Sequence, residues 1–142
     1  LAQRVHCQGC GAQAWVASGQ RTGDWMQMDL GEIQNIYGIR TQSRNGGQRV
    51  TEYSVQISQD GVTFTNVPDA QNLVGNTDDT DGAIVSNTFN TVSGRYVRIT
   101  VLAYISHPSM RADVITCGKF TKYFEIQKQI YFCTANTYRN LN

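Results

Sequence analysis

The stretch Gly23-Asp24-Trp25-Met26-Gln27-Met28-Asp29-Leu30-Gly31 decides the fold of this chain. It predicts a turn, a short strand and a second turn, because Gly31 suits a position that needs an unusual backbone angle. Both faces of the strand carry bulky or hydrogen-bonding groups, which indicates a central strand that is covered on both sides. Side chains alternate along a strand, so the two faces differ: Trp25, Gln27 and Asp29 on one, Met26, Met28 and Leu30 on the other.

Further short strands are expected along the chain, at 33–43, 51–58, 83–90, 95–101 and 110–117. In two of them apolar residues recur at every second position, which is typical of a strand with one buried face. Asp60-Gly61 predicts a tight hairpin turn, and Asn45-Gly46-Gly47 predicts a second hairpin tip between the strands at 33–43 and 51–58. Many short strands with regularly spaced turns predict an all-β sandwich or jelly roll. The alternating apolar residues are Tyr53, Val55 and Ile57, then Val97, Ile99 and Val101.

The composition of the chain limits what it can be. Its 142 residues are enough for one domain with a real core, and its formal net charge is +1. A charge this small argues against general nucleic-acid binding, which usually needs a strongly basic surface. No apolar run is long enough to span a bilayer, and no signal peptide is visible, so we expect a mature or trimmed form. The sequence has no nucleophile elbow, zinc-protease motif or phosphate-binding glycine loop, so we expect no enzymatic activity.

Four cysteines, an even number, permit two disulfides with three alternative pairings. A zinc site would need a second close pair besides the Cys-x-x-Cys pair, and the two later cysteines lie far apart without a nearby histidine. We therefore expect structural disulfides in a secreted domain, with the pairing left open. The cysteines are Cys7, Cys10, Cys117 and Cys133.

The tail at 118–142 differs in character from the rest of the chain. It holds four basic residues against one acid, so it carries a net charge of about +3. Its aromatic residues fall near a helical period, which would suit an amphipathic helix for a membrane surface or a partner. The alternative is a poorly ordered extension that Cys133 ties down, and we favour this alternative. We place the domain at 1–117 and the irregular or partly helical tail outside it.

An ordered set of motifs resembles the discoidin domain family, the type C domain of the blood-coagulation cofactors. Ala14-Trp15 and the stretch 25–31 are similar to the family's opening Ala-Trp and its Trp-x-Gln-x-Asp-Leu-Gly signature. Each motif alone is weak, but the complete set in the right order is specific. The later matches are Tyr37 to Arg44, Val50 to Tyr53, Ser58 to Gly61, Gly75 to Asp78, Asn87 to Phe89, and Arg95-Tyr96-Val97-Arg98-Ile99.

The chain departs from the family pattern in three places. The family's first strands, with the cysteine that pairs with the closing one, have no clear counterpart, so the chain is expected to start inside the domain. Cys117 matches the closing cysteine, and Cys7 or Cys10 could replace its usual partner. The family's His-Pro after Arg-Ile is replaced by Thr100-Val101, and its nearby Trp is replaced by Tyr104. The aromatic tail is no part of the pattern.

The resemblance implies an eight-stranded, extracellular, non-enzymatic jelly roll that binds ligands through loops at one end. Family ligands include anionic phospholipid, galactose-type sugars and proteins, so the fold does not select one of them. The matching loops lie at 15–24, 44–49 and 102–108, and the tip at 44–49 holds Asn and Gln between two arginines without an apolar anchor. Such a tip disfavours deep membrane insertion and favours polar or anionic glycans. The candidate contact residues are Trp15, Gln20, Arg21, Arg44, Asn45, Gln48, Arg49, Tyr104 and His107.

Two further groups have a structural and a functional interpretation. Asp29, Arg98 and Arg111 could bind an anion, but we expect an internal acid–base cluster that joins the strands, because inward charges must be paired. Trp25 is likewise expected in the core rather than at a contact. The acidic turn before Gly82 offers hard oxygen ligands for calcium, although its spacing does not match the helix-loop-helix calcium motif. The acidic residues of this candidate calcium site are Asp78, Asp79 and Asp81.

Three hypotheses about function follow. The first is a secreted or cell-surface module for adhesion or recognition that binds glycans or glycoproteins. The second is peripheral binding to anionic phospholipid, aided by Arg44, Arg49 and the basic tail, with steep salt dependence because ions screen surface charges. The third is a shortened domain that has only a structural or protein-interaction role.

Overall fold

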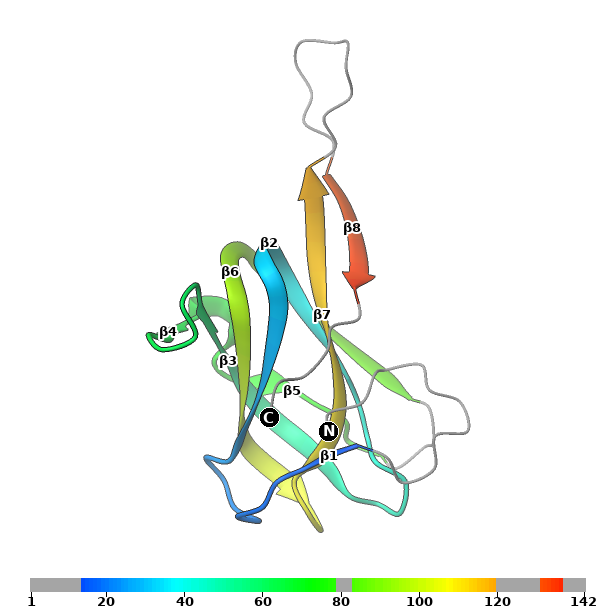
Figure 1. Ribbon diagram of the computed structural model, residues 1–142. Helices are drawn as coiled ribbons and strands as arrows, with labels where there is room; N and C mark the ends of the chain where they lie inside the picture. Colours follow the sequence, from blue (N-terminus) through cyan, green and yellow to red (C-terminus); the bar gives the residue numbers. More distant parts are fainter. Residues whose placement is uncertain (1–13, 79–82, 120–130, 137–142) are drawn as a thin grey trace.

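The computed structural model describes residues 14–78, 83–119 and 131–136, with 118–119 and 131–136 described by the backbone alone. The strands pair in the order β1-β7-β2-β6-β3-β4, while β5 pairs with β3 and β8 pairs with β7 (Figure 1). All the pairings are antiparallel. The elements are β1 (Trp15–Val16), β2 (Trp25–Gln42), β3 (Arg49–Ser58), β4 (Thr65–Asn66), the 3-10 helix η1 (Pro68–Ala70), β5 (Leu73–Val74), β6 (Ile84–Ile105), β7 (Ser109–Lys119) and β8 (Tyr131–Asn136).

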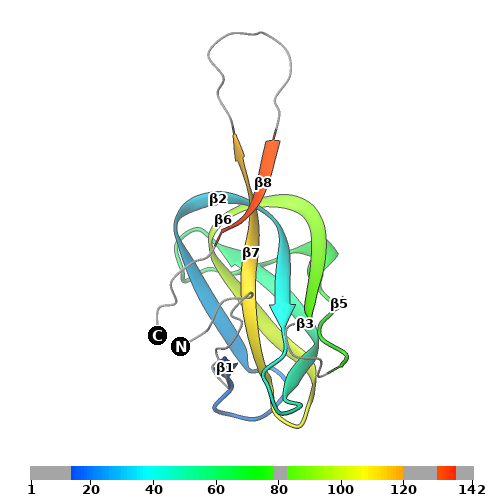
Figure 2. The same ribbon diagram turned by 90° about the vertical axis from the view of Figure 1, so that its right-hand side faces the viewer.

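Two long strands, β2 and β6, give the fold its two layers. Their pairing runs from Trp25 opposite Thr100 to Asp29 opposite Tyr96, shifts register, and resumes with Gln34 opposite Gly94. At this interruption both strands arch over, as Figures 1 and 2 show. The first half of β2 and the second half of β6 therefore form one layer with β3, and their other halves form the second layer with β7. The all-β sandwich predicted from the sequence is confirmed.

The arches replace two turns that the sequence predicts. Gly31 was expected to end a strand, and the expected strands at 83–90 and 95–101 were separate, but the chain continues in extended form through both places. Gly31 has a φ of +81°, and its N–H donates to Asp29 Oδ1 over 2.8 Å. A left-handed glycine in mid-strand bends the chain without stopping it, as in a β-bulge.

Alternating apolar side chains fill the space between the layers. The predicted inward residues of the strands at 51–58 and 95–101 all pack into this core, with Ile57 partly buried at its edge. From β2 the core receives Met26, Met28 and Leu30. The opposite face of β2 is more open than expected, because Trp25 is 49% exposed. The prediction of Trp25 as a core residue is therefore wrong.

The segment 44–49 connects the two layers. It was predicted as a hairpin tip, but β2 pairs with β6 and β7, whereas β3 pairs with β4, β5 and β6. The prediction of a hairpin is wrong because the chain crosses from one layer to the other here. Gly46 and Gly47, with φ of +88° and +78°, allow the reversal that this crossing needs. The second predicted hairpin, at Asp60-Gly61, is confirmed by the pairing of β3 with β4.

The described part of the tail is a strand. β8 pairs with β7 and extends beyond the arches (Figures 1 and 2). An irregular or helical form is therefore wrong for 131–136, while 120–130 and 137–142 lie outside the described residues. The backbone register sets Cys117 opposite Cys133, and Cys117 is disulfide-bonded. Cys7 and Cys10 lie outside the described residues, as does the side chain of Cys133.

Helical structure is scarce in the part of the chain that the structure describes. Within the described residues the single helical element is η1, which is three residues long. Accordingly, that part of the chain contains no helix with the length and apolar character needed to cross a bilayer.

Candidate functional site

Three connections meet at the end of the sandwich opposite the arches: residues 15–24, 44–49 and 102–108, which we call the loop end (Figure 1). Backbone hydrogen bonds hold the first connection against the other strands. Gly23 N donates to Val101 O over 2.8 Å, and Val101 N donates to Asp24 O over 2.9 Å. Ala17 N donates to Pro108 O over 3.0 Å. Residues far apart in sequence are thus fixed side by side.

Gln20 and Tyr104 were both predicted as contact residues, and the structure brings them together. The Tyr104 hydroxyl donates to Gln20 O over 2.9 Å, and Gln20 Nε2 lies 3.5 Å from Ser106 O. Gln20 and Ser106 have φ of +49° and +62°, and they are the two non-glycine residues with positive φ in the described chain. This backbone region is unfavourable for residues with a Cβ, and such strain tends to collect at functional sites.

The connection at 44–49 is linked to the connection at 102–108 through Gln48. The Gln48 Oε1 accepts a hydrogen bond from Arg44 Nη1 and lies 3.5 Å from Ser109 Oγ. Ser109 Oγ in turn lies 3.4 Å from His107 Nδ1. Four polar side chains therefore form a continuous series across the loop end, and three of them were predicted as contact residues.

The arginines at this end support the loop backbone. Arg111 is 2% exposed, donates to Ser43 O over 2.6 Å and lies 3.4 Å from Asn45 Oδ1. Arg49 Nη1 donates to Gly47 O over 3.0 Å. Arg111 thus helps to position Asn45, a predicted contact residue, from the buried side of the loop. The place of Arg111 in the β7 sequence does not reveal this role.

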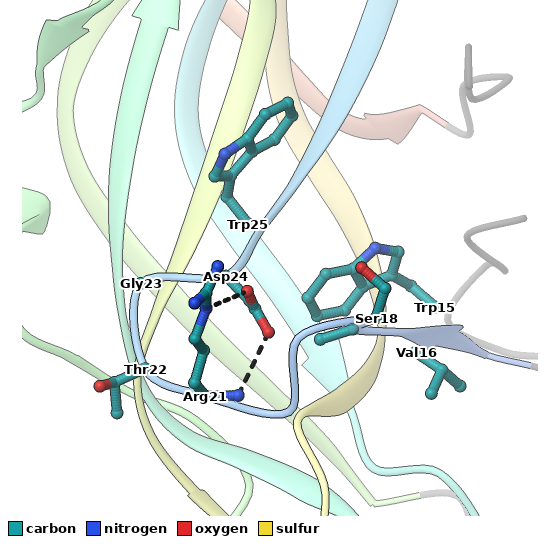
Figure 3. Close-up of a pocket in the computed structure, with 9 residues that line it drawn as sticks. Trp15, Val16, Ser18, Arg21, Thr22, Gly23, Asp24 and Trp25 are labelled. Carbon is teal, nitrogen blue, oxygen red and sulfur yellow. Dashed lines mark hydrogen bonds and ion pairs between the residues drawn. The ribbon is translucent and has the colours of Figure 1, made fainter.

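A pocket of about 500 Å³ opens beside the first connection (Figure 3). Trp15 and Trp25 lie at its sides, and Arg21 and Asp24 form an ion pair at its centre, with Arg21 Nε 3.5 Å from Asp24 Oδ1. Asp24 also accepts from Arg21 N over 3.2 Å. Two rings beside a carboxylate and a guanidinium suit a ligand with both apolar and hydroxyl faces.

Asp24 was predicted only as the end of the contact loop at 15–24, and Trp25 was expected in the core. Their position just before the central strand is a signal, because strand ends that carry loops are common sites of function. Trp15 was predicted, and it is partly buried against the core while its side chain also lines the pocket.

The predicted cluster of Asp29 with Arg98 and Arg111 is wrong. Asp29 accepts from Arg95 instead, with Nε to Oδ1 at 2.7 Å and Nη2 to Oδ2 at 2.8 Å. These hydrogen bonds hold the pKa of Asp29 below its ordinary value, and the Gly31 N–H acts in the same direction. The sequence placed Arg95 at the start of the expected strand at 95–101 and did not show that this end lies beside the arch of β2, so the pairing with Asp29 was missed.

Arg98 lies between two aromatic rings. Its guanidinium carbon is 4.1 Å from the Trp25 ring centroid and 3.7 Å from the Phe64 ring centroid, and Nη2 donates to Gln27 Oε1 over 3.0 Å. Loss of hydration in this position lowers the pKa of Arg98. The side chain therefore occupies a cation–π sandwich on the outer face of the layer that contains β3.

The calcium hypothesis stays a prediction. Asp78 is described and exposed, but Asp79 and Asp81 lie outside the described residues. Within the described part of the chain, no group of three or more His, Cys, Asp or Glu side chains is placed to hold a metal ion.

The geometry defines a class of protein: a β-sandwich whose connecting loops gather at one end. A family model, the F5/8 type C domain, matches residues 2–114. This chain belongs to that family, and the resemblance to discoidin domains found in the sequence is confirmed.

Three comparisons with known proteins show what this chain is similar to. Pig lactadherin is 34% identical over 113 residues, which cover 73% of this chain and 27% of lactadherin. Discoidin II of Dictyostelium discoideum superposes with a TM-score of 0.68 at 20% identity, over 81% of this chain and 48% of that chain. A Clostridium perfringens CBM32 module in complex with GalNAc-β-1,3-galactose superposes with a TM-score of 0.52 at 23% identity, over 65% of each chain. The chain thus spans about a quarter of the lactadherin that it matches.

Proposed function

We propose that this domain is an extracellular, non-enzymatic recognition module that binds the glycans of glycoproteins or matrix through its loop end. One observation carries the proposal: the two strained non-glycine residues of the described chain, Gln20 and Ser106, lie in contact at this end. Strain persists only where the surrounding structure enforces it, and it marks positions with a role beyond stability. Here the hydrogen bond from the Tyr104 hydroxyl to Gln20 O helps to enforce it.

The exposed chemistry of the loop end suits sugar hydroxyls. Asn45 is exposed, and the Arg21 side chain is 78% exposed beside the Asp24 carboxylate. Amides, carboxylates and guanidinium groups supply the donors and acceptors that a polyhydroxylated ligand needs. Trp15 and Trp25 add ring surfaces at the pocket, on which the apolar face of a sugar can stack. The CBM32 module that shares the fold is in complex with a disaccharide, which supports sugars as the ligand class.

A second candidate, binding to anionic phospholipid, is favoured by a specific observation. Val16 and Ile105 are 42% and 43% exposed at the loop end, and Ile105 lies opposite Arg49 in the β3–β6 register. An apolar side chain beside a cation suits the interface of an anionic bilayer. We rank this candidate second because the tip at 45–48 carries no large apolar side chain.

A side-by-side binding measurement tests the proposal. The folded protein is applied to a glycan array and to phosphatidylserine vesicles, each at low and high salt. We expect glycan binding that survives high salt, because hydrogen bonds and ring stacking are screened less than surface charge. Binding to vesicles alone, lost at high salt, would overturn the proposal in favour of the second candidate.

Substitutions locate the site on the array. We expect Asn45→Ala and Arg21→Ala to weaken binding to the strongest array glycan, since both side chains are exposed at the loop end. Gln59→Ala is the matched control, because Gln59 is an exposed polar residue at the far end of β3. Equal binding by all three variants and the parent would contradict a site at the loop end.

A further inference from the structure

A row of polar side chains crosses the outer face of the layer formed by β2, β6, β3 and β4. The strand registers set Gln27 opposite Arg98, Arg98 opposite Gln56, and Gln56 opposite Asn66. Gln56 Nε2 donates to Asn66 Oδ1 over 2.9 Å, and Arg98 Nη2 donates to Gln27 Oε1 over 3.0 Å. With strands about 4.8 Å apart, the row is about 14 Å long. We call these four residues the sheet row.

Arg98, the cation in the sheet row, has no anionic partner among the described residues. No carboxylate among the described residues lies within 4.0 Å of the Arg98 nitrogens, whereas Arg21 and Arg95 each have one. The Arg98 Nε is buried, and no described residue accepts a hydrogen bond from it, so an incoming group meets the Nη groups rather than Nε. Rings cover both faces of the guanidinium, so an incoming group can approach only in its plane. Partly buried charges are normally paired, so the sheet row has an unused capacity for an anion.

Trp25 connects the sheet row to the loop end. Its ring stacks on Arg98, and the residue also lines the pocket; Figure 3 shows its side chain extending from the Arg21–Asp24 pair toward the sheet. Nearly half of this large side chain is exposed, at 49%. A ligand that fills the pocket can therefore continue over Trp25 onto the sheet row without leaving the protein surface.

We propose that the sheet row is a second contact area of this module and that it takes an acidic sugar unit of a glycan chain whose neighbouring unit lies in the loop-end pocket. A uronate carboxylate is planar and fits a guanidinium edge through two parallel hydrogen bonds. The amides of Gln56 and Asn66 then bind ring hydroxyls. This inference rests on the proposed function for the ligand class, and it adds the charge of the sugar and the place where it binds.

The position of the sheet row argues against a membrane as its occupant. The sheet row lies on the flank of the sandwich, on the outer face of one layer, whereas the exposed Val16 and Ile105 lie at the loop end. A flat bilayer that touches the loop end would meet the molecule at that end and not along its flank. A flexible chain of sugars can follow both surfaces.

A pair of matched probes tests the charge of the ligand. One probe is an unsulfated hexasaccharide of alternating uronic acid and N-acetylhexosamine, and the other is its carboxyl-reduced, neutral counterpart. The readouts are the indole N–H signals of the two tryptophans, Trp15 and Trp25, and the Arg98 Nε–H signal in NMR spectra. We expect the acidic probe to shift the Trp25 and Arg98 signals and the neutral probe to leave Arg98 unmoved. An unmoved Arg98 signal with both probes, or equal shifts with both, would overturn the inference.

Surface variants keep the test independent of folding. We expect Gln56→Ala and Asn66→Ala each to weaken binding of the acidic probe by about 2- to 10-fold, the effect of one lost hydrogen bond. Asn72→Ala is the control, because Asn72 is an exposed asparagine outside the sheet row. If Asn72→Ala weakened binding of the acidic probe as much as Asn66→Ala does, this would contradict a site at the sheet row.

The two proposals fail in distinguishable ways. If Asn45→Ala and Arg21→Ala bind the acidic probe normally while Asn66→Ala does not, the loop-end proposal falls and the sheet row stands. If the loop-end variants lose binding and the sheet-row variants do not, the sheet row falls and the proposed function stands.

Discussion

Arg95 donates two hydrogen bonds, of 2.7 and 2.8 Å, to the Asp29 carboxylate, although the two residues lie 66 positions apart in the sequence. Asp29 precedes the arch of β2, and Arg95 follows the arch of β6. The Asp29 carboxylate also accepts the N–H of Gly31, the residue that bends β2. This ion pair thus joins the bend of β2 to the bend of β6. Because of these two bends, each strand contributes to both layers of the sandwich.

Removing this pair is expected to destabilise the protein most at neutral pH. The pKa of Asp29 is depressed in the folded state, so its contribution is present above the ordinary value of 3.8 and is lost as the pH falls through the lower, folded value. Arg95→Met should therefore lower the Tm at pH 7, and the difference from the parent should shrink below about pH 4. Thermal melts followed by circular dichroism between pH 2.5 and 7 measure this.

Arg21→Met is the control for that series. Arg21 also pairs with an aspartate, but its side chain is 78% exposed and the separation is 3.5 Å. Exposed pairs of this kind contribute little to stability. If Arg21→Met lowered the Tm at pH 7 as much as Arg95→Met does, this would contradict the role given to the Asp29–Arg95 pair.

Tyr53 should set the alkaline limit of stability. Its side chain is fully buried, and desolvation raises its pKa above the ordinary value of 10.0. The unfolded chain therefore loses the phenol proton first as the pH rises past about 10, which favours unfolding. Tyr53→Phe should lower stability by about 1 kcal/mol at pH 7, because the bond from Asn87 is lost. The same variant should lose less stability than the parent between pH 9.5 and 11, and urea melts at each pH would show whether it does.

Gly38 marks a close approach between β2 and β6. A Cβ at this position would lie 2.6 Å from the backbone oxygen of Asn87, which cannot move without disturbing the pairing. Gly38→Ala should cost about 1–3 kcal/mol, as overpacking commonly does. Gly46→Ala meets no atom within 4 Å, so its cost should be limited to the backbone penalty of about 1 kcal/mol. Equal losses of stability for Gly38→Ala and Gly46→Ala in denaturant melts would show that the close approach of β2 and β6 adds no cost.

Ser106 should contribute to binding at the expense of stability. Its φ of +62° suits glycine, so Ser106→Gly should leave the Tm unchanged or raise it. The same change makes the connection at 102–108 more flexible, so affinity for an array glycan should fall by a few fold, through lost preorganisation. Calorimetry and binding assays on one preparation test both halves. Lower stability with full affinity would contradict the functional interpretation of this strain.

The sequence was sufficient for the fold class because the buried faces alternate without interruption. Tyr53, Val55, Val97 and Ile99 could be assigned inward from a two-residue period alone, and all are fully buried. The same period does not say which layer a strand joins, so the connection at 44–49 was mistaken for a hairpin. Nor does it distinguish a glycine that ends a strand from one that bends it, as Gly31 does.

The sequence predicted where the candidate contact residues lie better than it predicted which residues they interact with. Tyr104 contacts Gln20, and Gln48 lies near Ser109 at the same end of the sandwich, as the family resemblance implied. The partners of charged residues could not be predicted, because side chains on one face are all candidates until the register is known. Asp29 pairs with Arg95 rather than Arg98 because the interruption in pairing brings the two arches together.

The most direct test of ligand recognition at the loop end is an NMR titration of the protein with its strongest array glycan, followed through backbone amide signals. We predict that the largest shifts fall within 15–24, 44–49 and 102–108. Shifts confined to the arches at 30–33 and to the turn at 59–63, at the other end of the sandwich, would contradict the account.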